Sequence, residues 1–112
     1  MDKTQEFHKA VSEALPKGSN ISVKSFNNVI LLAAADVNTL NAAAENISDY
    51  FQQHRIPMRI ALSGVFEIGS EAEKNFRAGL RSEITNLIAG FDSDKGFYQM
   101  VSRDLENDST DY

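Results

Sequence analysis

Two glycines ahead of a helix pattern are the first feature that could bind a phosphate group. The segment from Gly64 to Ser70 has the G-x-x-x-x-G spacing of a phosphate-binding loop. Such a loop continues with a lysine that reaches the phosphates, and Ser70 stands at that position. Glu71 and Glu73 place negative charge at the helix start, where a bound anion would otherwise be stabilised. We therefore interpret Gly64 as a bulge residue and Gly69 as the residue before a helix.

Three ionisable residues are candidates for general acid–base chemistry. His54 ends an apolar helix stripe, and His8 lies beside an aromatic residue. Glu67 lies among apolar residues near a strand end, either as a general acid or base or as an outward-facing carboxylate. No serine, histidine and carboxylate have a spacing that suggests a triad, and the chain has no cysteine for a thiolate or a thiolate metal site. The sequence therefore predicts a protein that is not an enzyme and indicates no cofactor and no metal.

Asp92, Asp94 and Gly96 resemble part of a calcium loop. The glycine comes one position early, and Lys95 occupies a place where an oxygen ligand belongs. We interpret the segment as a turn between helices, with Ser93 or Asp94 as a helix cap.

A basic stripe is the first candidate binding surface. Arg77 and Arg81 are four residues apart and Lys74 lies one turn earlier, so the three share one face of a continuous helix. This face suits an acidic partner. The alternative is a solvated face, because Glu73 and Arg77 have the spacing of an ion pair.

The net charge of −5 is concentrated near the C-terminal end. Residues 101–112 contain four acidic residues and one arginine, a balance of −3, which leaves −2 for residues 1–100. No broad basic surface exists for nucleic acid. We expect a single domain at residues 1–106, followed by a frayed acidic tail at residues 107–112. The acidic end as a whole, residues 104–112, is either a solubilising tail or a docking peptide for a basic partner.

The hydrophobic periodicity predicts seven elements. We expect helices over residues 3–15, 38–54 and 71–89, a hairpin over residues 21–34, and a long strand or two short strands over residues 58–68 with a bulge at Gly64. A short helix is expected from Ser93 or Asp94 to about Leu105. The predicted fold is a small two-layer α+β domain of order α-β-β-α-β-α-(α), with a three-stranded, mostly antiparallel sheet and helices packed on it.

The hairpin provides the second candidate surface. A type I′ turn at Asn27 and Asn28 pairs Phe26 with Val29 and Lys24 with Leu31. The second strand is apolar on both faces, so both need cover. Ile21, Val23, Ile30 and Leu32 make the stronger core face. Phe26, Val29 and Leu31 form a second patch, which another helix or a partner protein must bury.

Residues 4–69 resemble the BON-type domain of bacterial envelope proteins. The resemblance lies in the order of an N-terminal helix, a hairpin, a helix and a last strand, and in the alternating apolar residues from Ile21 to Leu32. It implies the same local arrangement of elements and assigns no functional residue.

These features predict a non-enzymatic protein-interaction module: a small inhibitor, an immunity or anti-defence factor, or an adaptor. The expected binding residues belong to the two candidate surfaces, namely Phe26, Val29, Leu31, Lys74, Arg77 and Arg81. The alternative is a homodimeric chaperone or assembly subunit of a secretion or envelope system, and a small enzyme using Glu67 or His54 is the least favoured. We expect a cytoplasmic protein, because the longest apolar run has seven residues, whereas a membrane span needs about 20.

Overall fold

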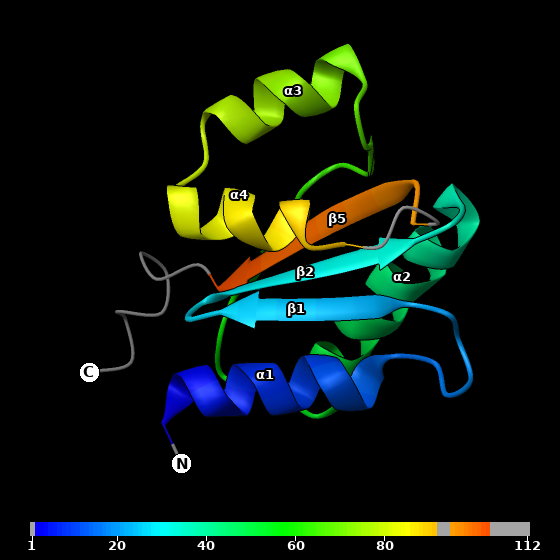
Figure 1. Ribbon diagram of the computed structural model, residues 1–112. Coiled ribbons are helices and arrows are strands. Elements are labelled where there is room, and N and C mark those ends of the chain that lie inside the picture. Colours follow the sequence, from blue (N-terminus) through cyan, green and yellow to red (C-terminus); the bar gives the residue numbers. More distant parts are fainter. Residues whose placement is uncertain (1, 92–94, 104–112) are drawn as a thin grey trace.

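The computed structural model describes residues 2–91 and 95–103 as an α+β domain in which helices cover an antiparallel sheet (Figure 1). The elements are α1 (Lys3–Ala14), β1 (Ser22–Phe26), β2 (Val29–Ala34), α2 (Val37–Gln53), β3 (Ile60–Leu62), β4 (Phe66–Glu67), α3 (Glu71–Ala78), α4 (Ser82–Ala89) and β5 (Phe97–Arg103). The predicted fold class is confirmed. Within the described residues the sheet has five strands rather than the expected three, in the order β1-β2-β5-β3, with β4 also paired to β5.

Strand β5 is the main correction to the predicted fold. Residues 97–103 were expected to be helical, and they form a strand between β2 on one side and β3 and β4 on the other. Apolar residues at 97, 98 and 101 suit either conformation. The strand is favoured over the helix because the second edge of β2 needs a hydrogen-bonding partner and both faces of β2 are buried.

The hairpin has the predicted register, from Ser22 opposite Ala33 to Phe26 opposite Val29. Asn27 has a φ of 51°, whereas the φ of Asn28 is not positive. The turn is therefore not the expected type I′ turn, which requires a positive φ at both central residues. The carbonyl of Asn27 accepts a hydrogen bond from His8 Nε2 at 2.6 Å, which ties the turn to α1.

Helices pack on both faces of the sheet, so the domain has one layer more than expected. On one face, α1 and α2 contribute Phe7 and Leu40 to a core that includes Ile30 and Leu32. On the other face, Ile84 and Ile88 of α4 form a second core with Leu31, Ala33 and Tyr98. Val23, an expected core residue, is 47% exposed because strand β1 lies at the edge of the sheet.

Gly64 lies in a β-bulge, as predicted. Leu62 pairs with Val101 and Phe66 pairs with Tyr98. The chain advances four residues from Leu62 to Phe66 while β5 advances three residues from Tyr98 to Val101. One extra residue on one strand of a pair defines a β-bulge. The bulge divides the segment into the two short strands β3 and β4.

The predicted helix over residues 71–89 is two helices, and this part of the prediction is wrong. The chain leaves α3 at Gly79 and enters α4 after Arg81. Glycine weakens a helix interior, and the two halves have different places to pack. Phe76 of α3 stacks on Phe66 of β4 with ring centroids 4.3 Å apart, whereas α4 lies against β1 and β2.

The other two helices agree with prediction to within one or two residues. Asp36 caps α2 by accepting hydrogen bonds from the Thr39 amide at 2.7 Å and the Thr39 hydroxyl at 2.8 Å. These hydrogen bonds, led by that of the Thr39 amide, lower the pKa of Asp36. No helix in the described part of the chain has both the length and the apolar character needed to cross a membrane.

Leu31→Ala tests the second core. Leu31 is 0% exposed, and truncation of such a side chain leaves a cavity that costs about 2–5 kcal/mol of unfolding free energy. The exposed control Val23→Ala should change it by less than about 0.5 kcal/mol. Chemical denaturation of the two variants measures both values, and equal small effects would contradict burial of Leu31 by α4.

Candidate functional site

Helix α4 forms one wall of two clefts, and its position is fixed by strand β1. Lys24 Nζ donates to the carbonyl oxygen of Gly90 at 2.7 Å, and its ammonium lies 5.5 Å from the centre of the Phe91 ring. A cation at this end of a helix is favourable because the last carbonyls have no helical partner. The lysine therefore anchors α4 at its C-terminal end, while Ile84 and Ile88 hold it on the sheet.

The first cleft, which we name the hairpin cleft, has a volume of about 260 Å³. Its residues include Phe26, Asn28, Val29, Arg81, Ile84 and Arg103. They come from the β1–β2 turn, the start of α4 and the end of β5. The cleft thus combines apolar side chains with two arginines.

The floor of the hairpin cleft is held by Asn28. Its backbone carbonyl accepts from the Arg103 amide at 2.9 Å. Its side-chain Oδ1 accepts from the Thr4 hydroxyl at 3.1 Å and from Arg103 Nη1 at 3.4 Å. Arg81, by contrast, pairs with Glu83 at 3.5 Å while its side chain stays 72% exposed. The cleft therefore offers a fixed floor and one guanidinium available to solvent.

The structure separates residues that the sequence placed together and joins others. Leu31 is fully buried under α4, so it offers no surface to a partner. Lys74 and Arg77 lie on α3, whereas Arg81 lies in the link before α4, so the expected stripe on one helix does not exist. Phe26 and Val29, from one predicted surface, share the hairpin cleft with Arg81 from the other.

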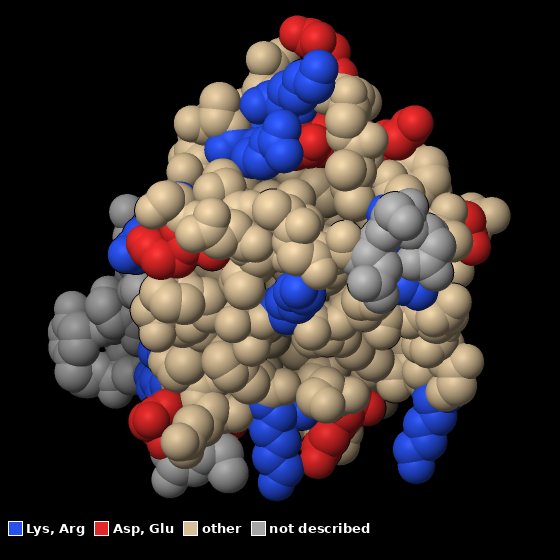
Figure 2. Space-filling view, in the orientation of Figure 1, with Lys and Arg blue, Asp and Glu red and all other residues tan. Residues whose placement is uncertain are grey.

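The charges over α3 confirm that this region is mixed rather than basic. Figure 2 shows basic and acidic side chains next to one another at the top of the molecule, where Figure 1 places α3. Arg77 Nε lies 3.5 Å from Glu73 Oε2, the ion pair predicted from their spacing. Below α3, the middle of this face is mostly uncharged.

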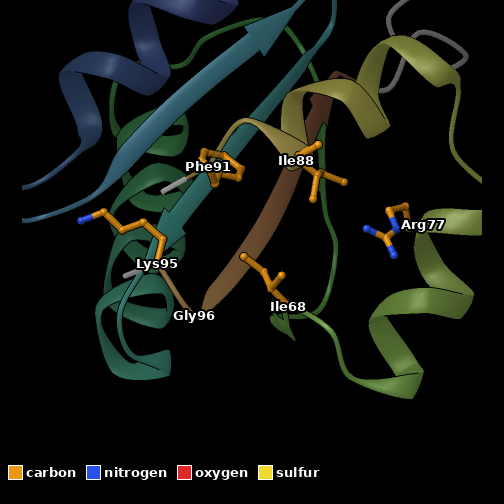
Figure 3. A pocket seen from close by; sticks show the side chains of 7 residues that line it. Ile68, Arg77, Ile88, Phe91, Lys95 and Gly96 are labelled. Carbon is orange, nitrogen blue, oxygen red and sulfur yellow. The ribbon is translucent and has the colours of Figure 1, made fainter. Parts of the chain in front are cut away.

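A second cleft, which we name the helix cleft, lies between α3, the C-terminal end of α4 and the residues before β5. Its volume is about 350 Å³, and it is lined by Ile68, Arg77, Ile88, Ala89, Phe91, Lys95 and Gly96 (Figure 3). Arg77 is the residue that links this cleft to the sequence predictions.

Glu73 is the functional-site residue whose environment the sequence did not reveal. It is 0% exposed, and its Oε2 accepts a hydrogen bond from the Tyr98 hydroxyl at 2.9 Å. Its Oε1 accepts from the Gly69 amide at 3.0 Å, and its own amide donates to Ser70 Oγ at 3.2 Å. The S-x-x-E pattern from Ser70 to Glu73 predicts the contact of the Ser70 hydroxyl, whereas the Glu73 side chain reaches the amide of Gly69 rather than that of Ser70. The buried contact with Tyr98 depends on β5, for which the local sequence has no signal.

Burial raises the pKa of the Tyr98 hydroxyl, and the hydrogen bond to Glu73 raises it further. A phenol in this setting keeps its proton, because ionisation would place a second negative charge beside the Glu73 carboxylate. Tyr98 therefore acts as a hydrogen-bond donor to Glu73.

The three acid–base candidates lie outside both clefts. Glu67 is exposed on β4, and His54 is the exposed C-cap of α2, with its ring 4.0 Å from that of Tyr50. The Tyr50 hydroxyl donates to Glu13, which raises the pKa of Tyr50. His8 Nε2 donates its hydrogen bond to the Asn27 carbonyl.

Within residues 2–91 and 95–103, no three histidine or carboxylate side chains gather as a metal site. The calcium-loop residues Asp92 and Asp94 and the acidic tail at residues 104–112 lie outside the described residues.

Searches with this chain find no matching family model, no matching curated protein and no matching solved structure. The resemblance to BON-type domains therefore remains a likeness in the order of elements over residues 4–69.

Tyr98→Phe tests the buried contact. Loss of the hydroxyl leaves Glu73 without one of its partners and should lower the free energy of unfolding by about 1–3 kcal/mol at neutral pH. The folded state holds the Tyr98 proton more tightly than the unfolded state, whose pKa is near 10.0. This stabilisation is complete below pH 10 and lost as the pH rises above it, so the variant should show a shallower alkaline decline.

Urea denaturation at a series of pH values from neutral to alkaline measures both effects. Tyr50→Phe is the control, because it removes an exposed hydroxyl contact and should change neutral stability by less than about 0.5 kcal/mol. A Tyr98→Phe protein with wild-type stability and an unchanged alkaline decline would show that the contact carries no stability.

Proposed function

We propose that this chain is a non-enzymatic protein-interaction module of the cytoplasm, such as a small inhibitor, an immunity or anti-defence factor, or an adaptor. The partner binds at the hairpin cleft. One observation carries the proposal: Phe26 and Val29 share a cleft of about 260 Å³ with Arg81 and Arg103.

The chemistry of the hairpin cleft favours an acidic segment that also carries an apolar side chain. The apolar side chain would lie against Phe26, Val29 and Ile84, and a neighbouring carboxylate would accept hydrogen bonds from Arg81. Arginine suits this role because its guanidinium binds a carboxylate through two parallel hydrogen bonds. Aromatic and arginine side chains are also the residues that most often dominate binding energy at interfaces.

The fixed floor supports the same proposal. Asn28 is held from α1 by Thr4 and from β5 by Arg103. A partner therefore meets a turn that is already ordered, and less conformational entropy is lost on binding. The exposed side chain of Arg81 is the part that has to adjust.

The test is quantitative affinity capture with the full chain as bait, comparing wild type with Arg81→Glu and Phe26→Ser. We expect the captured amount of at least one protein to fall by about tenfold or more with either variant. A tenfold loss of affinity corresponds to about 1.4 kcal/mol of binding free energy. Lys74→Glu is the matched control, because it makes the same charge reversal on exposed α3.

A captured set that is the same for wild type, Arg81→Glu and Phe26→Ser would contradict the hairpin cleft as the binding surface. If Lys74→Glu reduces capture of the same protein as much as Arg81→Glu does, the net charge of the chain and not the hairpin cleft determines binding. Circular dichroism of each variant establishes that the fold is retained.

The second candidate function is a homodimeric chaperone or assembly subunit of a secretion or envelope system. The second apolar face of the sheet, which a second copy of the chain would have to bury in such a dimer, is covered by α4. The observation that favours a dimer is instead the edge strand β1, whose Val23 is 47% exposed. An edge strand has unpaired backbone groups that a second copy can pair with.

Sedimentation velocity at micromolar concentrations distinguishes the two candidates. Pairing through β1 predicts a dimer in wild type and a monomer in Val23→Lys, because a charged side chain on an edge strand blocks pairing. A strict monomer in wild type at all concentrations would contradict the second candidate and leave the first unaffected.

A further inference from the structure

The helix cleft lies at the opposite end of α4 from the hairpin cleft. Ile84 lines the hairpin cleft, whereas Ile88, Ala89 and Phe91 line the helix cleft. Its volume of about 350 Å³ is near the lower end of the range for small-molecule sites. The cleft is therefore separate from the proposed protein-binding surface.

The walls of the helix cleft are mostly apolar. Ile68, Ile88 and Phe91 contribute side chains to it (Figure 3). Ile68 is 36% exposed, one of four large hydrophobic side chains that are exposed in the described part of the chain. Burying this surface against an apolar ligand would be favourable.

Arg77 provides the main polar group of the cleft. In Figure 3 its guanidinium points from α3 toward Ile68 and Ile88. Its Nε faces the buried Glu73 carboxylate at 3.5 Å, and Glu73 is held in turn by Tyr98. A guanidinium has five N–H donors, so the terminal nitrogens remain able to bind an anion while Nε is held.

Lys95 also lines the cleft, but its ammonium is directed away from it. Lys95 is 6% exposed, and its Nζ donates to Asn20 Oδ1 at 2.9 Å. Its ammonium points away from Ile68 and Arg77 in Figure 3. Among the described residues that line this apolar cleft, Arg77 is the cation directed into it, and it defines the ligand that would fit.

We propose that the helix cleft binds a small amphiphilic monocarboxylate. The carboxylate would accept two hydrogen bonds from the terminal nitrogens of Arg77, and the apolar body would lie against Ile68, Ile88 and Phe91. Glu73 and Tyr98 act as positioning residues, because they orient Arg77 and do not reach the ligand. This proposal does not depend on a protein partner at the hairpin cleft.

The test uses three probes with the same eight-carbon chain and different head groups: octanoate, octan-1-ol and octylammonium. Each is titrated below its micelle-forming range into the full chain with labelled isoleucine methyl groups. We expect octanoate to shift the Ile68 and Ile88 signals saturably, at concentrations at least tenfold lower than octan-1-ol. Octylammonium should be the weakest, and the signal of Ile47 in the opposite core should not move.

Arg77→Gln should abolish the preference for octanoate over octan-1-ol. Lys74→Gln, which removes a charge from the same helix outside the cleft, should retain it. Arg77→Lys keeps a cation beside the buried Glu73, so this variant should fold even if Arg77→Gln does not. It should weaken octanoate binding because an ammonium does not bind a carboxylate through a planar pair of donors.

Three results would overturn the proposal. One is absence of saturable octanoate binding to wild type. Another is equal binding of octanoate and octan-1-ol. The third is an unchanged preference for octanoate in Arg77→Gln, or in Arg77→Lys if the first variant does not fold.

Discussion

The rest of the structure depends on strand β2, which is buried on both faces. Ile30 and Leu32 face the layer of α1 and α2, and Leu31 and Ala33 face α4, each with at most 2% of its surface exposed. A strand of this kind needs a helix on each side and a hydrogen-bonding strand at each edge. Strands β1 and β5 are the hydrogen-bonding partners at the two edges of β2. The position of α4 on the second face then creates a cleft at each of its ends.

The contact between Glu73 and Tyr98 joins the outlying helix α3 to the centre of the sheet. A buried carboxylate is costly unless its oxygens have partners, and here the Tyr98 hydroxyl, the Gly69 amide and Arg77 provide them. Glu73 also pairs with Arg77 Nε at 3.5 Å, and the guanidinium of Arg77 points toward Ile68 and Ile88 in Figure 3. Stability and the chemistry of that cleft therefore share one buried group.

Local patterns predicted local structure well. The turn at Asn27 and Asn28 determined the register of β1 and β2, and Gly64 marked the bulge. Strand β5 and the break at Gly79 were missed because both depend on contacts distant in sequence. The candidate site also combines local and distant information. Residue type alone was enough to select Phe26, Val29 and Arg81. That they line one cleft depends on the break before α4, and that Leu31 is covered depends on where α4 packs. The buried role of Glu73 required β5.

The central claim is that α4 of this chain covers the second face of the sheet and forms one wall of the two clefts proposed as binding sites. Nuclear Overhauser contacts between methyl groups in solution test it most directly. The account predicts contacts from Leu31 to Ile84 and Ile88, together with protection of Leu31 from a soluble paramagnetic agent. Absence of these contacts, with Leu31 signals strongly broadened by the agent, would contradict it and return the sheet face to consideration as the binding surface.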